Sequence, residues 1–229
     1  MNTLEKRAVF FDVGGTLIEP RPRVGDVYAR EGRRFGLDVD GETMHRAFRA
    51  AFARREREAA LITPNMEREW WRDLVAAVMA QFGPLSDFDA CFDALYAYFA
   101  MPEAWFVFPD VFPALASLRA RGLALGIVSN WDSRLVSLCD GLGLSPYMQA
   151  MAISSLVGHA KPSPKIFRNA LATLGVSAAE AIHVGDSVDM DYRGAAGAGI
   201  DAVIIDRHGD IRAPGVRTVA SLDMLGRYL

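Results

Sequence analysis

The sequence predicts an α/β protein in which helices cover a parallel sheet and a block of helices is inserted after the first strand. Three observations predict this fold. Residues 21–99 show helical periodicity, whereas short apolar runs alternate with helix-like stretches after residue 100. One isolated strand-like run precedes the helical block and needs partners from beyond it. The 229 residues suffice for one large domain or for a domain with a substantial insertion.

The first strand and the inserted helices follow from the residue pattern. Residues 8–13 (AVFFDV) form a short β-rich run that ends at Gly14 and Gly15. Four stretches then place apolar residues three and four positions apart, which is the spacing of amphipathic helices. Consecutive helices without strands between them pack as a small bundle. The predicted helices span residues 24–35, 41–61, 65–82 and 86–99.

After residue 100, strands and helices alternate. Near-continuous apolar strands between helices are typical of a parallel sheet covered on both faces. We therefore expect a Rossmann-like core domain of residues 1–20 and 100–229, and a four-helix domain of residues 21–99. The predicted strands are residues 123–129, 149–154, 181–185 and 201–206, and the predicted helices are residues 109–122, 132–143, 163–175 and about 190–198.

The composition excludes several classes of protein. A content of 51% apolar residues with a net charge of -3 disfavours disorder. The 25 basic residues do not exceed the 28 acidic ones, so we expect no nucleic-acid partner. No apolar run approaches the roughly 20 residues that span a bilayer. Cys91 and Cys139 are far apart, and no secretory signal precedes the first strand, so we expect free thiols and a cytoplasmic protein.

Polar side chains follow several of the predicted strands. Asp12 ends the first strand, Ser129 ends the second, Lys161 follows the third, and Asp186 and Asp191 follow the fourth. The carboxyl ends of parallel strands meet at one edge of a sheet, where ligands bind. A carboxylate there can bind a hard cation or act as a nucleophile, and a hydroxyl with an ammonium group suits a phosphoryl group. Several carboxylates together are costly unless a cation such as Mg²⁺ offsets their charge.

Four motifs carry a family resemblance. FFDVGGTL, VSN, AKPSPKIF and HVGDSVDMDYRGAAGAG occur in the order and spacing of the motifs of the haloacid dehalogenase-like (HAD) hydrolase superfamily. RPRVGDVYAREGRRFGL, EREWWRD and SNWDSRL resemble, more narrowly, the rhythmically-expressed-gene-2-like branch. The resemblance implies that the helical insert is a cap that closes over the site and selects substrates.

The resemblance also implies roles for individual residues. Asp12 would be the nucleophile that forms an aspartyl intermediate, and Ser129 and Lys161 would hold the transferring phosphoryl oxygens. Asp191 would orient metal-bound water or Lys161. The Mg²⁺ site would comprise Asp12, the carbonyl of Gly14 and Asp186, with Asp191 beside it.

Other positions allow two interpretations. Thr16 is a candidate for substrate binding. Asn130 either binds substrate or shapes the turn, and Trp131 either lines the entrance or packs locally. Three aromatic residues of the helical block are expected in its core rather than on a substrate platform. They are Phe52, Trp70 and Trp71.

One position departs from the family pattern. Family phosphatases usually carry a second aspartate two residues after the nucleophile as general acid and base, and this chain has Gly14. Glycine keeps the carbonyl that a metal needs but cannot transfer a proton, a role typically worth about 10²- to 10⁴-fold in rate. Either the substrate has a good leaving group, as in acyl or aryl phosphates, or a cap residue or His159 replaces the aspartate.

The sequence therefore predicts a Mg²⁺-dependent phosphatase for a small phosphorylated metabolite. A metal-independent 2-haloacid dehalogenase is the first alternative, because Asp12 and Asn130 fit it, although that family typically has tyrosine where Gly14 stands. A catalytically weakened binding or regulatory protein is the second, because Gly14 removes a proton donor. We expect no membrane partner and a monomer or homodimer.

Overall fold

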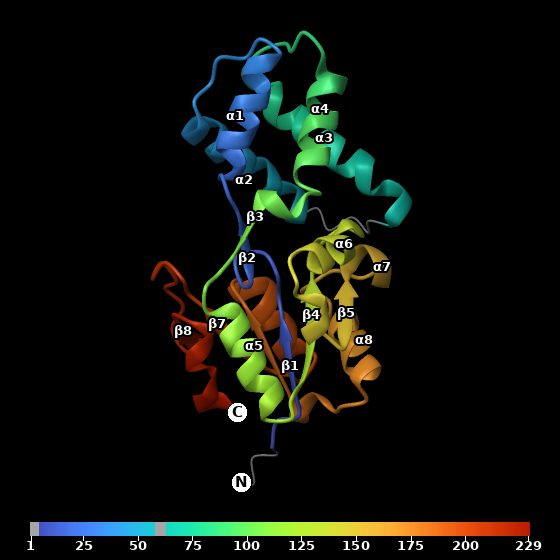
Figure 1. Cartoon of the computed structure of the whole chain (residues 1–229), viewed down its shortest axis with the longest axis vertical. Coiled ribbons are helices and arrows are strands. Elements are labelled where there is room, and N and C mark those ends of the chain that lie inside the picture. The colour runs from blue at the N-terminus through green and yellow to red at the C-terminus, as the bar shows by residue number, and fades with distance from the viewer. Residues whose placement is uncertain (1–4, 58–62) are drawn as a thin grey trace. The chain divides into compact units, whose positions relative to one another are not determined.

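The computed structural model describes residues 5–57 and 63–229, and the chain divides into two compact units (Figure 1). One unit comprises Met1–Glu19 and Val107–Leu229, and the other is Pro20–Phe106. The second crossing thus follows Phe106 rather than residue 99. Strands β2 (Ile18–Pro20) and β3 (Trp105–Val107) pair with each other at the two crossings, a feature that the sequence pattern did not predict.

A six-stranded parallel sheet forms the centre of the first unit, which confirms the predicted fold class. The spatial order of its strands is β5-β4-β1-β6-β7-β8. Strand β1 lies between β4 and β6, with Ala8 opposite Ala124 and Ala181. The chain therefore builds the sheet on one side of β1 and then on the other. The strands are β1 (Ala8–Phe11), β4 (Ala124–Ser129), β5 (Ala150–Ile153), β6 (Ala181–Gly185), β7 (Asp201–Ile205) and β8 (Thr218–Val219).

Helices cover both faces of this sheet. Phe10 packs in a buried cluster with Ile166 and Phe167 of α8, whereas Val9 and Phe11 point to the opposite face and are also fully buried. Residues on both faces are apolar for this reason, and β1 reads as a continuous apolar run. The helices of this unit are α5 (Val111–Ala120), α6 (Arg134–Gly141), η3 (Ser145–Tyr147), α7 (Ser154–Val157), α8 (Pro164–Leu174), η4 (Ala178–Glu180), η5 (Val188–Arg193), α9 (Gly194–Gly197) and η6 (Leu222–Tyr228).

The chain direction changes sharply at the ends of α8. Pro164 occupies the first turn, where no backbone N–H is needed, and Gly175 ends the helix with a left-handed φ of 62°. Several short elements of this unit were not predicted, among them α7, β8 and η6. The segment predicted as a helix over about residues 190–198 forms η5, whose turns are wider than those of an α-helix, followed by α9.

The second unit contains the four predicted helices, which are α1 (Val24–Arg34), α2 (Gly41–Arg57), α3 (Glu67–Met79) and α4 (Phe88–Tyr98). Residues 58–61, predicted to continue α2, lie outside the described residues. The bundle has its own buried core, which includes Met44, Leu74 and Phe92. The aromatic residues of α2 and α3 pack against this core, as predicted, and ring centroids of Trp70 and Trp71 are 4.9 Å apart. Within the described residues, no helix has the length and apolar character to cross a membrane.

Candidate active site

Three loops of the first unit meet at the carboxyl ends of its central strands. The backbone N–H of Asp12 donates to Val184 of β6 at 2.8 Å, so the residue continues the edge of the β1–β6 pairing. Ser129 is the last residue of β4, and its hydroxyl donates to Oδ1 of Asp12 at 2.8 Å. Asp186 directly follows β6. Since β1 is where the strand order reverses, these side chains lie where ligands bind in open α/β sheets.

Lys161 bridges two buried carboxylates. Its ammonium donates to Oδ1 of Asp12 at 2.7 Å and to Oδ1 of Asp191 at 2.6 Å. Burial alone lowers the pKa of a lysine, but these two carboxylates raise the pKa of Lys161 above its usual range. Burial raises the pKa of Asp12; the ammonium of Lys161 opposes the rise, and the carboxylate of Asp191 adds to it. Lys161 therefore remains a cation and only partly balances the charge around it.

Asp186 adds a third carboxylate. Oxygen atoms of Asp12, Asp186 and Asp191 all lie within 4.8 Å of one another. Burial of its carboxyl group, together with the negative charges of Asp12 and Asp191, raises the pKa of Asp186 to about 7, although the residue as a whole is exposed. Three carboxylates facing one ammonium leave excess negative charge, and carboxylate oxygens are the ligands that Mg²⁺ prefers. The donor set therefore fits a divalent cation.

Gly15 makes room for this cluster. Its φ is +74°, a backbone conformation that residues other than glycine rarely adopt. A Cβ atom at this position would lie 2.2 Å from Oδ2 of Asp186. Gly15 thus allows the loop after β1 to pass directly against the Asp186 carboxylate.

His183 is a site residue that the sequence analysis did not consider. It lies in β6, is fully buried, and its Nε2 is 2.8 Å from Oδ1 of Asp191. The backbone N–H of Ser187 donates to Oδ2 of the same carboxylate at 3.0 Å. Burial raises the pKa of a carboxyl group, but Lys161 and the contact with His183 hold the pKa of Asp191 well below its usual range. A histidine within an otherwise apolar strand was the signal that could have revealed it.

Asn130 holds the backbone of Lys161. Its side-chain nitrogen donates to the carbonyl of Lys161 at 3.0 Å, and its side-chain oxygen accepts from the Lys161 N–H at 2.7 Å. Both polar atoms of the amide are used in this way, so the geometry favours positioning of Lys161 over direct substrate binding. The contact joins the end of β4 to the loop before α8.

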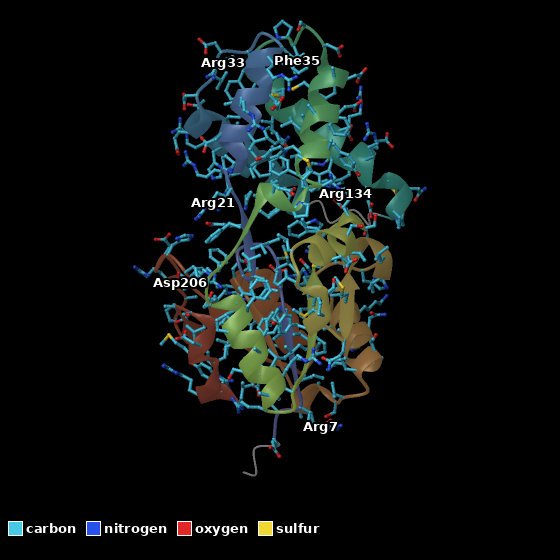
Figure 2. The ribbon with its side chains drawn as sticks, viewed as in Figure 1. Arg7, Arg21, Arg33, Phe35, Arg134 and Asp206 are labelled. Carbon is cyan, nitrogen blue, oxygen red and sulfur yellow. The ribbon has the colours of Figure 1, made fainter. Side chains whose placement is uncertain are left out.

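The remaining candidates lie in different surroundings. Thr16 is fully buried, its carbonyl accepts from Arg207 at 2.6 Å, and among the described residues its hydroxyl has no hydrogen-bond partner. Trp131 is half-buried and its indole lies beside Gly14, and His159 is half-buried in the loop that leads to Lys161. Figure 2 shows Arg134, three residues after Trp131, at the end of the first unit where β4 leads into α6.

The fold and the site define an α/β protein with an acidic cluster at the strand ends, and comparison with known proteins specifies the family. The chain belongs to the haloacid dehalogenase-like hydrolases, whose family profile matches residues 6–199. Relatives named haloacid dehalogenase-like hydrolase domain-containing protein 3 and rhythmically expressed gene 2 protein are among its matches, which confirms the narrower resemblance.

The relatives include more than one chemistry. The chain is 36% identical over 208 residues to the mouse haloacid dehalogenase-like hydrolase domain-containing protein 3, covering 88% of this chain and 82% of that protein. It is 33% identical over 225 residues to a glyceraldehyde 3-phosphate phosphatase of Methanopyrus kandleri, covering 88% and 84%. The solved structure of an L-2-haloacid dehalogenase matches 98% of each chain with a TM-score of 0.77 and 25% identity.

Proposed function

We propose that this hydrolase is a Mg²⁺-dependent phosphatase that acts on a small phosphorylated metabolite through Asp12. The observation that carries the proposal is the state of the Asp12 carboxylate. Ser129 and Lys161 both donate to Oδ1, and none of the described residues donates a hydrogen bond to Oδ2. One oxygen is thus held in place, while the other can attack a phosphorus atom.

The neighbouring donors suit the phosphoryl group. An ammonium has three donor hydrogens, and Lys161 uses two of them for Asp12 and Asp191, which leaves the third for a phosphoryl oxygen. The hydroxyl of Ser129 lies on the same oxygen of Asp12 and can turn toward a bound phosphate. In the first step Oδ2 of Asp12 bonds to phosphorus and the leaving group departs, and in the second step water releases phosphate and restores the carboxylate.

A divalent cation would be held by Asp12, Asp186 and the carbonyl of Gly14. When bound, Mg²⁺ offsets the carboxylate charge and draws negative charge from the phosphoryl oxygens. Asp191, the fourth residue predicted for this site, already accepts from Lys161, His183 and Ser187. We therefore assign Asp191 to orienting Lys161 and the water around the metal.

We further propose that the helical unit acts as a cap that selects the substrate, and that the protein works in the cytoplasm as a monomer or homodimer. Its four helices have a core of their own and join the sheet-containing unit through two short crossings. Such a unit can move as a body without disturbing the sheet.

The test is release of inorganic phosphate from a panel of small phosphate esters, with and without Mg²⁺. We expect Mg²⁺-dependent release that Asp12→Asn abolishes, a loss of about 10³-fold or more. Asp189→Asn is the matched control, because this nearby carboxylate is exposed and pairs with Arg193 instead. Release that Asp12→Asn does not change, or no release from any ester, would contradict the proposal.

A 2-haloacid dehalogenase is the second candidate, because the matched dehalogenase structure spans the whole fold and a halide needs no proton to leave. The same variants are tested for chloride release from 2-chloropropionate. Chloride release that depends on Asp12 but not on Mg²⁺, without phosphate release from the esters, would establish this reaction instead.

A further inference from the structure

The indole ring of Trp131 occupies the space that a side chain at position 14 would need, and Gly14 has no side chain to compete with it. A Cβ atom on Gly14 would lie 3.3 Å from Cζ3 and 4.0 Å from Cη2 of the indole. Gly14 lacks the positive φ that Gly15 has, so its backbone conformation alone does not demand glycine. The indole of Trp131, rather than the backbone, is what crowds a larger residue at position 14.

The backbone that carries this ring is held firmly. The N–H of Trp131 donates to Oγ of Ser154 at 3.1 Å, and the same hydroxyl donates back to the carbonyl of Trp131 at 3.0 Å. The preceding residue, Asn130, is tied to the backbone of Lys161. The backbone of Trp131 is therefore a fixed part of the loop after β4, and the residue is half-buried.

The pair borders the reacting carboxylate. Gly14 lies two residues after Asp12, and Trp131 lies two residues after Ser129, whose hydroxyl contacts Asp12. Of the described groups that donate to Asp12, Lys161 is held as a cation by two carboxylates and cannot readily give up a proton. Position 14 therefore supplies no acid, and the edge of the Trp131 ring lies beside it.

We propose that Trp131 is a specificity-determining residue that restricts the substrate to phosphates with a planar leaving group that departs as a stable anion, namely aryl and acyl phosphates. The proposal rests on the phosphatase function above. An indole offers a face or an edge for contact with a planar leaving group. Since neither a glycine nor an indole can act as a general acid, leaving groups that need protonation are disfavoured.

The chemistry balances without an acid in the first step. Oδ2 of Asp12 forms a bond to phosphorus, the bond from phosphorus to the leaving oxygen breaks, and its electron pair leaves with a phenolate or carboxylate. In the second step water attacks phosphorus, its proton passes to the released phosphate, and the carboxylate of Asp12 is restored. The quantity to compare between substrates is kcat/KM, which reports the steps through formation of the aspartyl phosphate.

The first experiment measures kcat/KM with Mg²⁺ for a series of substituted phenyl phosphates and for glycerol phosphate. In the wild type we expect kcat/KM to fall about 100-fold or more as the phenol becomes less acidic, with glycerol phosphate slowest. The double variant Gly14→Asp/Trp131→Ala supplies an acid and the space for it, and should raise kcat/KM for glycerol phosphate about 100-fold. Gly14→Asp alone should gain less, because the new side chain contacts the indole.

The second experiment compares benzoyl phosphate with acetyl phosphate. Both are acyl phosphates with a carboxylate leaving group, and only benzoyl phosphate carries an aromatic ring. Trp131→Ala should lower the ratio of their kcat/KM values about tenfold, whereas Trp131→Phe should retain most of it. Thermal unfolding of each variant establishes that it is folded. These outcomes together support the assignment of the substrate class.

Two results would overturn it while leaving the phosphatase function intact. One is Asp12-dependent hydrolysis of glycerol phosphate as fast as that of nitrophenyl phosphate in the wild type, and the other is an unchanged benzoyl-to-acetyl ratio in folded Trp131→Ala. If no phosphate in either experiment is hydrolysed in an Asp12-dependent way, the proposed function itself fails, and this inference fails with it.

Discussion

Two clusters of polar groups in the sheet-containing unit are built around aspartate, and they differ in charge balance. The site cluster sets Asp12, Asp186 and Asp191 against one ammonium, that of Lys161. The second, which we name the Asp110 cluster, comprises Asp110, Arg207, Ser221 and Leu222. There one carboxylate accepts from the guanidinium at 3.1 Å, from the Ser221 hydroxyl at 2.9 Å and from the Leu222 N–H at 2.7 Å.

The pKa values of Asp12 in the site cluster and of Asp110 in the second cluster shift in opposite directions. Burial raises the pKa of Asp12, and the neighbouring carboxylate of Asp191 adds to it. At Asp110 the effect of burial is outweighed by hydrogen bonds from Leu222 and Ser221 and by Arg207, so its pKa is lowered. A carboxylate with all its partners in the chain stabilises the fold, whereas a cluster with excess negative charge suits a bound cation. This difference in pKa shift identifies the Asp110 cluster as a structural ion pair and the site cluster as the candidate active site.

The largest effect is expected when the ammonium group of Lys161 is removed from the site cluster. Lys161→Met leaves Asp12 and Asp191 buried without their shared partner, and should lower the free energy of unfolding by about 3–5 kcal/mol in metal-free buffer. Added Mg²⁺ should recover part of this loss, because ligand binding to the folded state stabilises it. Denaturant unfolding with and without Mg²⁺ measures both. Lys165→Met, at an exposed lysine, is the control and should change little.

Removal of the carboxylate from the Asp110 cluster should have the next largest effect. Asp110→Ala leaves Arg207 and the Leu222 N–H without this acceptor, and we expect a loss of about 2–3 kcal/mol. Added Mg²⁺ should restore the variant no more than it stabilises the wild type, in contrast to Lys161→Met. Asp140→Ala, at an exposed aspartate, is the control in the same denaturant titration. A preferential rescue of Asp110→Ala by Mg²⁺ would refute the distinction between the clusters.

Removal of one negative charge from the site cluster should have a smaller effect of opposite sign. Because burial raises the pKa of Asp12, its ionised form costs stability at neutral pH in the absence of a cation. Asp12→Asn should therefore raise the midpoint of thermal unfolding in metal-free buffer while abolishing activity, and it should weaken the stabilisation by Mg²⁺. A lower midpoint would show that the Lys161–Asp12 contact stabilises the fold more than the charge excess destabilises it.

The smallest effects concern the pH dependence of stability, to which Asp110 and Asp12 should contribute with opposite sign. A lowered folded-state pKa means that Asp110 stabilises the fold above the ordinary aspartate value of 3.8 and that this contribution is lost as the pH falls. A raised folded-state pKa means that the contribution of Asp12 declines as the pH rises above 3.8. The free energy of unfolding is measured across pH for the wild type, Asp110→Asn and Asp12→Asn. Each substitution should remove the pH dependence that its aspartate contributes.

The site cluster was largely predictable and the Asp110 cluster was not, for a physical reason. Asp12, Ser129 and Asp186 each stand at the end of a recognisable strand, and parallel strands bring their carboxyl ends to one edge. Asp110 begins a helix, and its partners come from the loop after β7 and from η6, elements without a strong pattern. The same holds within the site, where the contacts of His183 and Asn130 depend on the packing of one segment against another.

The α/β class, the four inserted helices, the family, and the strand-end positions of the candidate nucleophile and candidate metal ligands all followed from the sequence. Hydrophobic periodicity and the residue types at strand ends are local properties, so they can be recognised from the sequence alone. Only the tertiary structure decided which oxygen of Asp12 is engaged, that Asn130 holds Lys161, and that the ring of Trp131 stands beside Gly14. These are contacts between residues distant in sequence, and they exist only because the sheet brings the loops after its strands together.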